Sequence, residues 1–253
     1  MGQVRFEVSD HIALITLDHP EKRNSVDAAM SSQLAEIWRE VDKNDDIRVG
    51  IVTGQGDKAF CAGGYIPSYV DDGVVGAAGS GDRTTLPKPW PLWKPVIAAI
   101  RGAAVGGGFG LALSCDLRVV AHNAKIGPSG LRRGVVQGAQ QTQRLVRLIG
   151  LSRALELLLL SRYVDGDEAY RLGLAQRVED SADVLDAAHE WATAISHFSP
   201  AAVQTTKKLA YLGTDLPLQE AFDWEEQLTV ESFRTPAAAE GFASFVDGRA
   251  ASF

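Results

Sequence analysis

The residues best suited to chemistry in this sequence are glycines that follow an apolar, strand-like run. Gly106–Gly108 come after Val96–Ile100 and precede Phe109–Cys115, a segment typical of the start of a buried helix. A strand that turns through glycines into a helix leaves backbone N–H groups unpaired at the helix N-terminus, and no Cβ atoms block the approach to them. Such a turn suits a phosphate, a carboxylate or an oxyanion that forms during a reaction.

A second glycine element favours the oxyanion among these three kinds of group. By itself Gly106–Gly108 is explained better by close helix–strand packing, because it lacks the spacing of a dinucleotide-binding or P-loop motif. Ile51–Gly64, with the sequence IVTGQGDKAFCAGG, also runs from a strand pattern into glycines. Two such elements in one fold can supply two N–H donors to one carbonyl oxygen, and losing one donor typically costs about 3–4 kcal/mol of transition-state stabilisation. The pair therefore predicts an oxyanion site.

Composition limits the classes of function. A chain of 253 residues is long enough for one good core, and its net charge of −7 argues against nucleic acid as a partner. Cys61 and Cys115 are the only cysteines, which favours a reducing, cytoplasmic location over a disulfide scaffold. No cluster has metal-ligand spacing. The N-terminus begins a strand pattern rather than a signal peptide, and the most apolar stretch contains Arg101 and several glycines, which argues against a membrane span.

The elements that must position these glycines follow from periodicity. Asn24–Ser25 offer a helix N-cap, and Pro67–Trp93 and Lys125–Arg133 read as loops. Strands are predicted at Val4–Val8, Ile12–Leu17, Val49–Thr53, Val96–Ile100 and Leu117–Ala121, and Phe60–Gly64 is an apolar stretch that ends in a glycine pair. Helices are predicted at Asp27–Asp42, Ala139–Leu160 with a break near Gly150, Asp167–Gly173, Ala182–His197, Ala201–Leu212, Leu218–Arg234 and Pro236–Arg249. This order predicts an α/β core over residues 1–198 and a helical C-terminal region over 199–253.

Several stretches together resemble a known family. In chain order, GQGDKAFCAGG, KPVIAAIRGAAVGGGFGLALSCDLRVVAHNAKIG, QTQRLVRLIGLSRALELLL and DEAYRLGLAQRV resemble the enoyl-CoA hydratase/isomerase family, the crotonase superfamily. NSVDAAM and EGFASFVDGRAASF resemble its first and last helices. The resemblance implies a spiral of ββα units with two near-perpendicular sheets, and a helical C-terminal region that forms trimers, often paired into hexamers. It implies an acyl-CoA substrate and no further cofactor.

The resemblance also implies which residues form the oxyanion hole and contact CoA. The oxyanion hole falls on the backbone N–H groups of Gly64 and Gly107. Lys58 is placed where it can reach the pyrophosphate, although a solvated lysine in a turn is an equal alternative. The other positions that match CoA-contacting residues of the family are Lys22, Arg23, Ala62 and, toward a neighbouring subunit, Phe245.

This sequence departs from the family's hydratases at the acid–base positions. Their two glutamates, which activate water, correspond to Gly110 and Gly130, and glycine has no acid–base group. The aspartate that usually follows the oxyanion-hole residue is Tyr65. Two glycines of the family's G-A-G-G-T-Q turn are Gln140 and Gln141, and a CoA-binding lysine is Gly248.

Several residues are candidates for replacement chemistry, each with a structural alternative. Tyr65 is able to donate a proton, or it packs at the start of a loop. Arg132 and Arg133 suit a substrate carboxylate, or they are solvated. Gln137, Gln140 and Gln141 suit a water or an anion, or they cap a helix. The remaining candidates are Asp71 and Asp72 in the long loop, His122, which reads as a surface residue, and Asp116, which reads as an orienting residue.

Three functional readings follow. The first is an enzyme that stabilises a thioester enolate without the usual glutamates, for example a decarboxylase, because loss of CO₂ forms the enolate without a protein base. The second is a protein that binds acyl-CoA without turnover, and the third is an ordinary hydratase. The two glycines at 110 and 130 argue against the third reading.

Overall fold

The computed structural model describes residues 2–67 and 92–253. It opens with a hairpin of β1 (Gln3–Ser9) and β2 (Ile12–Asp18), paired antiparallel from Gln3 opposite Asp18 to Ser9 opposite Ile12. Asp10 and His11 form the turn with positive φ angles of 49° and 66°. The predicted pair of N-terminal strands is thereby confirmed.

Two sheets are built from repeating units. The larger has the order β1-β2-β3-β5-β7-β9, in which every pair from β2 onward is parallel, and the smaller is a parallel sheet of order β4-β6-β8. Each unit contributes one strand to each sheet. The strands are β3 (Val49–Gly54), β4 (Ala59–Cys61), β5 (Val96–Ile100), β6 (Ala103–Val105), β7 (Leu117–Ala121), β8 (Lys125–Gly127) and β9 (Arg177–Glu179).

Two local predictions are corrected. Lys125–Arg133 begins with strand β8 rather than being loop throughout, because three residues are too short to show a period. Asp27, not Asn24 or Ser25, caps α1 (Ala28–Lys43): its Oδ1 accepts from Met30 N at 2.9 Å. Asn24 is instead fully buried, and its Nδ2 donates to the Ala59 carbonyl at 2.7 Å, which ties the turn before α1 to β4.

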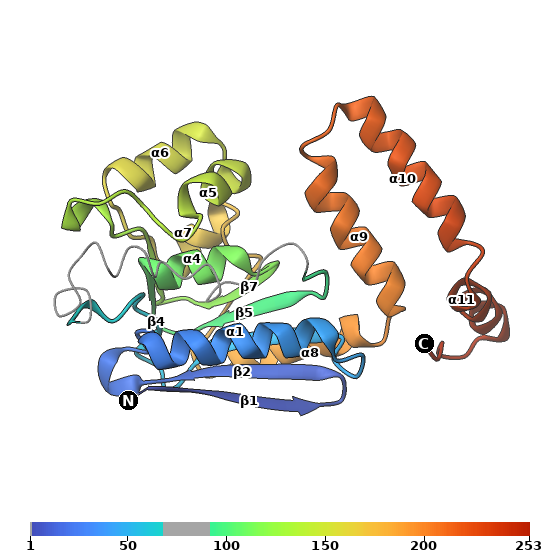
Figure 1. Cartoon of the computed structure of the whole chain (residues 1–253), viewed down its shortest axis with the longest axis horizontal. Coiled ribbons are helices and arrows are strands. Elements are labelled where there is room, and N and C mark those ends of the chain that lie inside the picture. The colour runs from blue at the N-terminus through green and yellow to red at the C-terminus, as the bar shows by residue number, and fades with distance from the viewer. Residues whose placement is uncertain (1, 68–91) are drawn as a thin grey trace.

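Two of the remaining helices, α4 and α8, pack on the sheets. Figure 1 shows α4 and α8 on opposite sides of the β-structure; α4 packs on the small sheet and α8 across β3, β5 and β7. Residues 151–160 follow a glycine break, as predicted. The bounds are α4 (Gly107–Ser114), α5 (Gln141–Ile149), α6 (Leu151–Leu159), α7 (Gly166–Arg171), α8 (Val184–Ser196), α9 (Pro200–Gly213), α10 (Leu218–Ser232) and α11 (Pro236–Asp247).

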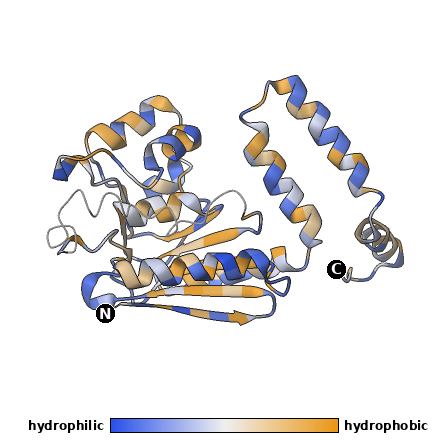
Figure 2. Cartoon of the chain, viewed as in Figure 1, coloured by the Kyte–Doolittle hydropathy of each residue, from blue (hydrophilic) through white to orange (hydrophobic). Residues whose placement is uncertain are grey.

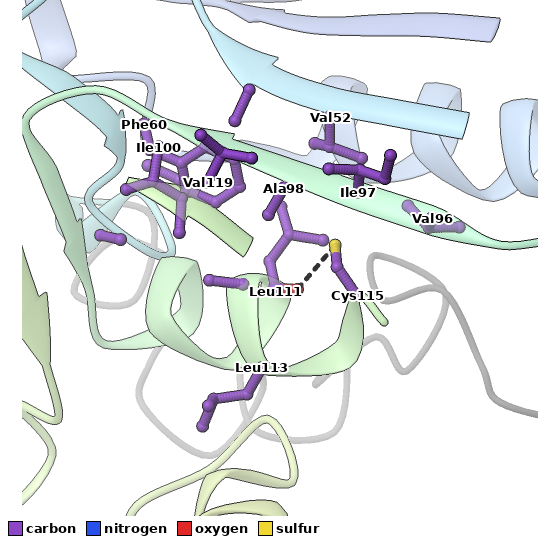
Figure 3. Close-up of a cluster of buried hydrophobic side chains, with 14 of the residues drawn as sticks. Val52, Phe60, Val96, Ile97, Ala98, Ile100, Leu111, Leu113, Cys115 and Val119 are labelled. Carbon is purple, nitrogen blue, oxygen red and sulfur yellow. Dashed lines mark hydrogen bonds between the residues drawn. The ribbon is translucent and has the colours of Figure 1, made fainter. Parts of the chain in front are cut away.

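The core lies where α4 meets the central strands. Leu111 and Cys115 of α4 face β5 residues Ile97 and Ala98, and Phe60 of β4 lies at the end of the same cluster (Figure 3). All five are at most 3 % exposed. Because burial of a large apolar side chain contributes roughly 1.5–3 kcal/mol, this cluster fixes α4, and with it the glycine turn at its start.

Helices α9–α11 stand to one side of the sheets (Figure 1). The body and this region are joined by polar contacts: Arg48 donates to the Phe253 carbonyl, and Lys207 of α9 pairs with Asp116. In the described residues no helix is both long and apolar enough to span a membrane.

Candidate active site

The two glycine turns meet backbone to backbone. A Cβ on Gly107 would lie 3.3 Å from Gly63 Cα and 3.5 Å from Gly64 N. A Cβ on Gly63, which has a φ of +93°, would lie 2.8 Å from Gly107 N. Glycine is required at 63 both by this contact and by the left-handed backbone. The turns predicted from separate stretches of sequence therefore form one site.

The backbone N–H groups of Gly64 and Gly107 are both available there. Neither donates to an acceptor among the described residues, whereas the neighbouring Tyr65 N–H donates to Val26 O at 2.9 Å. Gly107 is the first residue of α4, and no side chain caps this helix at Gly106. The helix N-terminus adds partial positive charge beside the two N–H groups. The arrangement suits an oxygen atom that gains negative charge.

Cys61 lies under this site but is not a nucleophile. Its thiol is buried and accepts a hydrogen bond from Gly63 N at 3.4 Å. Burial raises the pKa of the Cys61 thiol to about 12, and that of the Cys115 thiol to about 12. Both therefore stay protonated at neutral pH, and the thiolate is the reactive form.

Tyr65 is half-buried and packed beside His19. The two ring centroids are 6.1 Å apart, and the His19 ring nitrogen Nδ1 lies 3.0 Å from Ser25 O. This agrees with the structural alternative for Tyr65, a ring packed at the start of a loop.

Other groups fill the space around Gly110 and Gly130. A Cβ on Gly110 would lie 2.4 Å from Ala139 Cβ and 2.6 Å from Ala139 O. A Cβ on Gly130 would lie 2.9 Å from Gln137 Oε1, to which the Gly130 N–H donates at 2.7 Å. The loop between β8 and α5 thus closes over both positions.

The three glutamines in this loop differ in their roles. Gln140 is exposed, has a φ of 60°, and accepts from Arg144 Nε at 3.0 Å. Gln141 is buried as the first residue of α5 and donates through Nε2 to Gly138 O at 2.8 Å; no side chain caps this helix, so the capping alternative is not confirmed. Gln137 reaches Gly130, and its Nε2 is buried without a partner in the structure. Of the three, Gln137 is the one joined to a predicted site position.

The remaining candidates lie around the site or away from it. Arg132 donates to Ser161 O at 2.8 Å, and Arg133 donates to Ser129 O at 3.0 Å. His122 is exposed and pairs with Asp167, as a surface residue does. Asp116 orients structure, as expected, because its carboxylate accepts from Val96 N. Asp71 and Asp72 lie outside the described residues.

Some of the residues predicted to contact CoA lie together. Arg23 and Lys58 line one cleft of about 280 Å³, together with Gln55 and Asn24. Ala62 donates through its N–H to Arg23 O at 3.0 Å, so it links the cleft to the glycine turn at 63–64. Lys22 is exposed next to Arg23 but does not line this cleft.

The C-terminal candidates lie apart from this cleft. Phe245 lies on α11 and is 85 % exposed, with no place in the cleft. Gly248 ends α11 in a left-handed conformation with a φ of +66°. Glycine is favoured there by the backbone alone, which accounts for it without reference to CoA.

Sequence reasoning missed Ser129. A Cβ on Gly106 would lie 2.7 Å from Ser129 Oγ, so this hydroxyl lies directly beside the glycine turn. Ser129 is 7 % exposed, and its carbonyl oxygen accepts a hydrogen bond from Arg133 at 3.0 Å. The only signal in the sequence is its position immediately before Gly130, where a family glutamate would stand.

Comparison with known proteins gives a consistent result. The Enoyl-CoA hydratase/isomerase family model matches residues 7–253. (E)-Benzylidenesuccinyl-CoA hydratase of Thauera aromatica is 38% identical over 99% of this chain and 98% of its own length. A putative enoyl-CoA hydratase/isomerase of Bacillus subtilis is 37% identical over 96% of this chain and 94% of its own. The crystal structure of an enoyl-CoA hydratase from Bacillus anthracis superposes with a TM-score of 0.95 at 31% identity, covering 99% of this chain and 98% of that one.

Proposed function

Because the chain belongs to the enoyl-CoA hydratase/isomerase family, we propose that it binds an acyl-CoA thioester with the carbonyl oxygen between the N–H groups of Gly64 and Gly107. The observation that carries this proposal is the contact between the two glycine turns, in which a Gly107 Cβ would lie 3.5 Å from Gly64 N. When the thioester becomes an enolate, negative charge moves onto that oxygen. Two fixed donors at a helix N-terminus stabilise this charge more than they stabilise the neutral thioester.

The coenzyme A part of the substrate extends toward the cleft lined by Arg23 and Lys58. These two cations suit the phosphates, and the Ala62–Arg23 hydrogen bond supports a continuous path from cleft to oxyanion site. We include Lys22 as an outer contact and Phe245 as a contact to a neighbouring subunit's substrate. No cofactor beyond the coenzyme A of the substrate enters this proposal.

The reaction we propose is one that needs no glutamate at 110 or 130. The side chains that fill these positions in space are Ala139 and Gln137, neither of which titrates. Decarboxylation meets this condition, since cleavage of the C–CO₂ bond leaves its electron pair on the α-carbon and thus forms the enolate directly. Isomerisation or hydration requires a proton carrier, for which Tyr65 is the candidate nearest in sequence to the oxyanion site.

We also propose a trimer or a dimer of trimers, and a cytoplasmic location. The exposed apolar side chains of α9–α11 support the assembly. Cys61 and Cys115 are free thiols, which supports a reducing compartment.

The test is substitution of Gly107. Gly107→Ala adds a methyl group 3.5 Å from Gly64 N, and Gly107→Val adds two more carbons there. We expect [1-¹³C]butyryl-CoA to bind about 10- to 100-fold less tightly to Gly107→Val, by calorimetry, because overpacking a filled site costs about 1–3 kcal/mol. We also expect the infrared carbonyl stretch to move to lower frequency on binding to the wild type, and to move less in Gly107→Ala.

Gly213→Ala on α9 is the matched control, since its added Cβ meets only the Ala221 methyl at 3.8 Å. It should bind and shift the carbonyl band like the wild type. Unchanged affinity and an unchanged band shift in Gly107→Val would show that the thioester oxygen does not lie between these turns.

A further inference from the structure

The Gln137 side chain is fixed in an orientation that directs its nitrogen away from Gly130. Its Oε1 accepts the Gly130 N–H at 2.7 Å, so the two atoms of the amide cannot be exchanged without losing this bond. The Nε2 atom is then a buried donor with no acceptor among residues 2–67 and 92–253. Buried donors are almost always paired, so an orphan of this kind indicates a missing acceptor.

A hydroxyl group, that of Ser129, lies in the same segment, next to the oxyanion site. Ser129 is 7 % exposed, and its Oγ lies 2.7 Å from where a Gly106 Cβ would be. Arg133 donates to the carbonyl of Ser129 at 3.0 Å, which brings a guanidinium close to it. Gln137 is bonded to Gly130, the residue that follows Ser129, so both side chains belong to the same loop, and the Ser129 hydroxyl lies beside the start of α4.

The charge of this segment points to an anion. Residues 124–155 contain no Asp or Glu, although the whole chain has a net charge of −7. The basic residues of the segment are Lys125, Arg132, Arg133, Arg144, Arg147 and Arg153, of which Arg147 and Arg153 pair with Asp215 and Glu156. The phosphates of coenzyme A do not account for this charge, because the proposed function places them at Arg23 and Lys58.

We propose that Gln137 Nε2 and Ser129 Oγ select acyl-CoA thioesters whose acyl group carries a carboxylate. This inference rests on the proposed function, which puts the thioester between Gly64 and Gly107. The carboxylate accepts one hydrogen bond from each donor, and Arg133 contributes charge nearby. A carboxylate suits these donors better than a neutral acyl chain, since hydrogen bonds to charged acceptors are roughly twice as strong as neutral ones.

The test compares thioesters matched in chain length. Malonyl-, succinyl- and glutaryl-CoA are titrated by calorimetry against propionyl-, butyryl- and valeryl-CoA, respectively. We expect at least one carboxylate-bearing thioester to bind about 10- to 100-fold more tightly than its neutral counterpart. Gln137→Glu keeps the acceptor for Gly130 N–H but replaces the free donor by a charged oxygen. Gln137→Glu should abolish this preference while leaving the affinity for the neutral thioester within about threefold of that of the wild type.

Two further variants separate recognition from folding. Ser129→Ala should reduce the preference about fivefold to tenfold without changing the melting temperature by more than a few degrees. Gln143→Ala, on the exposed side of α5, is the matched control for removal of a glutamine and should keep the full preference.

The outcomes distinguish this inference from the function beneath it. Equal binding of all three pairs to the wild type would overturn the inference and leave the proposed function intact, as would a preference that survives in Gln137→Glu. Failure of all six thioesters to bind would overturn the proposed function and this inference together.

Discussion

At the scale of single residues, Gly110 and Gly130 differ in what surrounds them. A Cβ at 110 would meet the Ala139 methyl at 2.4 Å and its carbonyl at 2.6 Å. At 130 the nearest atom, Gln137 Oε1 at 2.9 Å, ends a flexible side chain, although the Val136 and Val135 carbonyls follow at 2.9 and 3.0 Å. A side chain added at position 130 therefore meets less crowding than one added at position 110.

Hydration of crotonyl-CoA is expected to be slow. Each acid–base group of a hydratase contributes about 10²- to 10⁴-fold in rate, and the effects of groups that act together are not additive. The wild type should be at least about 100-fold slower than a dedicated short-chain hydratase assayed in parallel by loss of the enoyl absorbance. A comparable turnover number would show that another group, such as Tyr65, supplies the proton transfer.

The crowding around Gly110 also limits how the two glutamates of a hydratase can be restored. Gly110→Glu should unfold at lower urea concentration than the wild type, because overpacking against the Ala139 backbone costs about 1–3 kcal/mol or more. Gly130→Glu should be tolerated better, because the atoms nearest to its added Cβ lie at 2.9–3.0 Å rather than 2.4–2.6 Å. Only Gly130→Glu is therefore a clean test of whether a carboxylate restores hydration, and a gain in rate there would support the interpretation that the fold lacks only its acid–base groups.

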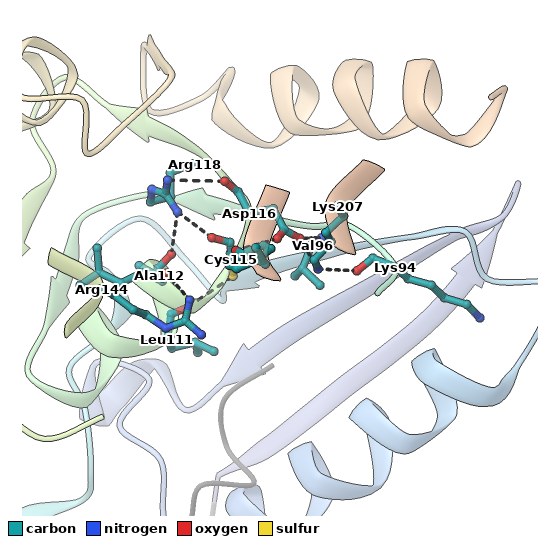
Figure 4. Close-up of polar contacts among 11 residues, drawn as sticks. Lys94, Val96, Leu111, Ala112, Cys115, Asp116, Arg118, Arg144 and Lys207 are labelled. Carbon is teal, nitrogen blue, oxygen red and sulfur yellow. Dashed lines mark hydrogen bonds and ion pairs between the residues drawn. The ribbon is translucent and has the colours of Figure 1, made fainter. Parts of the chain in front are cut away.

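At the scale of elements, one polar cluster attaches α9 to the core. Asp116 Oδ2 accepts from Val96 N and from Lys207 Nζ, both at 2.7 Å, and Oδ1 accepts from Tyr211 OH at 3.0 Å (Figure 4). Lys207 Nζ also donates to Lys94 O at 2.9 Å. The side chains of Lys207 and Asp116 are only 10% and 16% exposed. Three elements, β5, β7 and α9, therefore meet at one carboxylate.

Removing one partner of this pair should destabilise the protein strongly. Lys207→Met leaves the buried Asp116 carboxylate without its cation, and such losses typically cost about 3–5 kcal/mol. We expect a correspondingly lower free energy of unfolding in urea. Lys208→Met, the exposed neighbour on the same helix, is the control and should stay within about 0.5 kcal/mol. Equal stability of both variants would mean that α9 is held by other contacts.

At the scale of the whole molecule, the C-terminal helices leave apolar surface uncovered. Figure 2 shows apolar residues recurring along α9–α11, which stand beside the sheets rather than on them. The exposed ones include Leu218, Phe222, Phe233, Phe242, Phe245 and Val246. Many exposed large apolar side chains on consecutive helices are typical of a subunit interface.

We expect the protein to be at least a trimer at micromolar concentration. Light scattering should give a mass of three or more times the chain mass of 27.1 kDa. Phe245 and Val246 are 85% and 83% exposed on α11, so Phe245→Asp with Val246→Asp should shift the population toward monomer. Glu36→Lys on α1 changes an exposed polar residue and should leave the mass unchanged. A stable wild-type monomer would contradict the expected assembly.

The sequence by itself determined the long elements and the family. Helices such as α1 and α8 were predictable because apolar residues recur every three or four positions over several turns. The glycine turns at 61–64 and 106–108 were recognisable because a strand pattern precedes each of them. The absence of glutamate at 110 and 130 was likewise evident from the residues alone.

Only the tertiary structure decided which strands pair and which residues contact one another. Three-residue strands such as β6 and β8 carry no period, so their pairing depends on the neighbouring sheet. Gln137 is seven positions from Gly130, yet its amide fills the space where a side chain at position 130 would begin. Ser129 lies beside Gly106, although the two residues are 23 positions apart. Such contacts arise from the path of the loop across α4, and residue spacing along the chain does not encode that path.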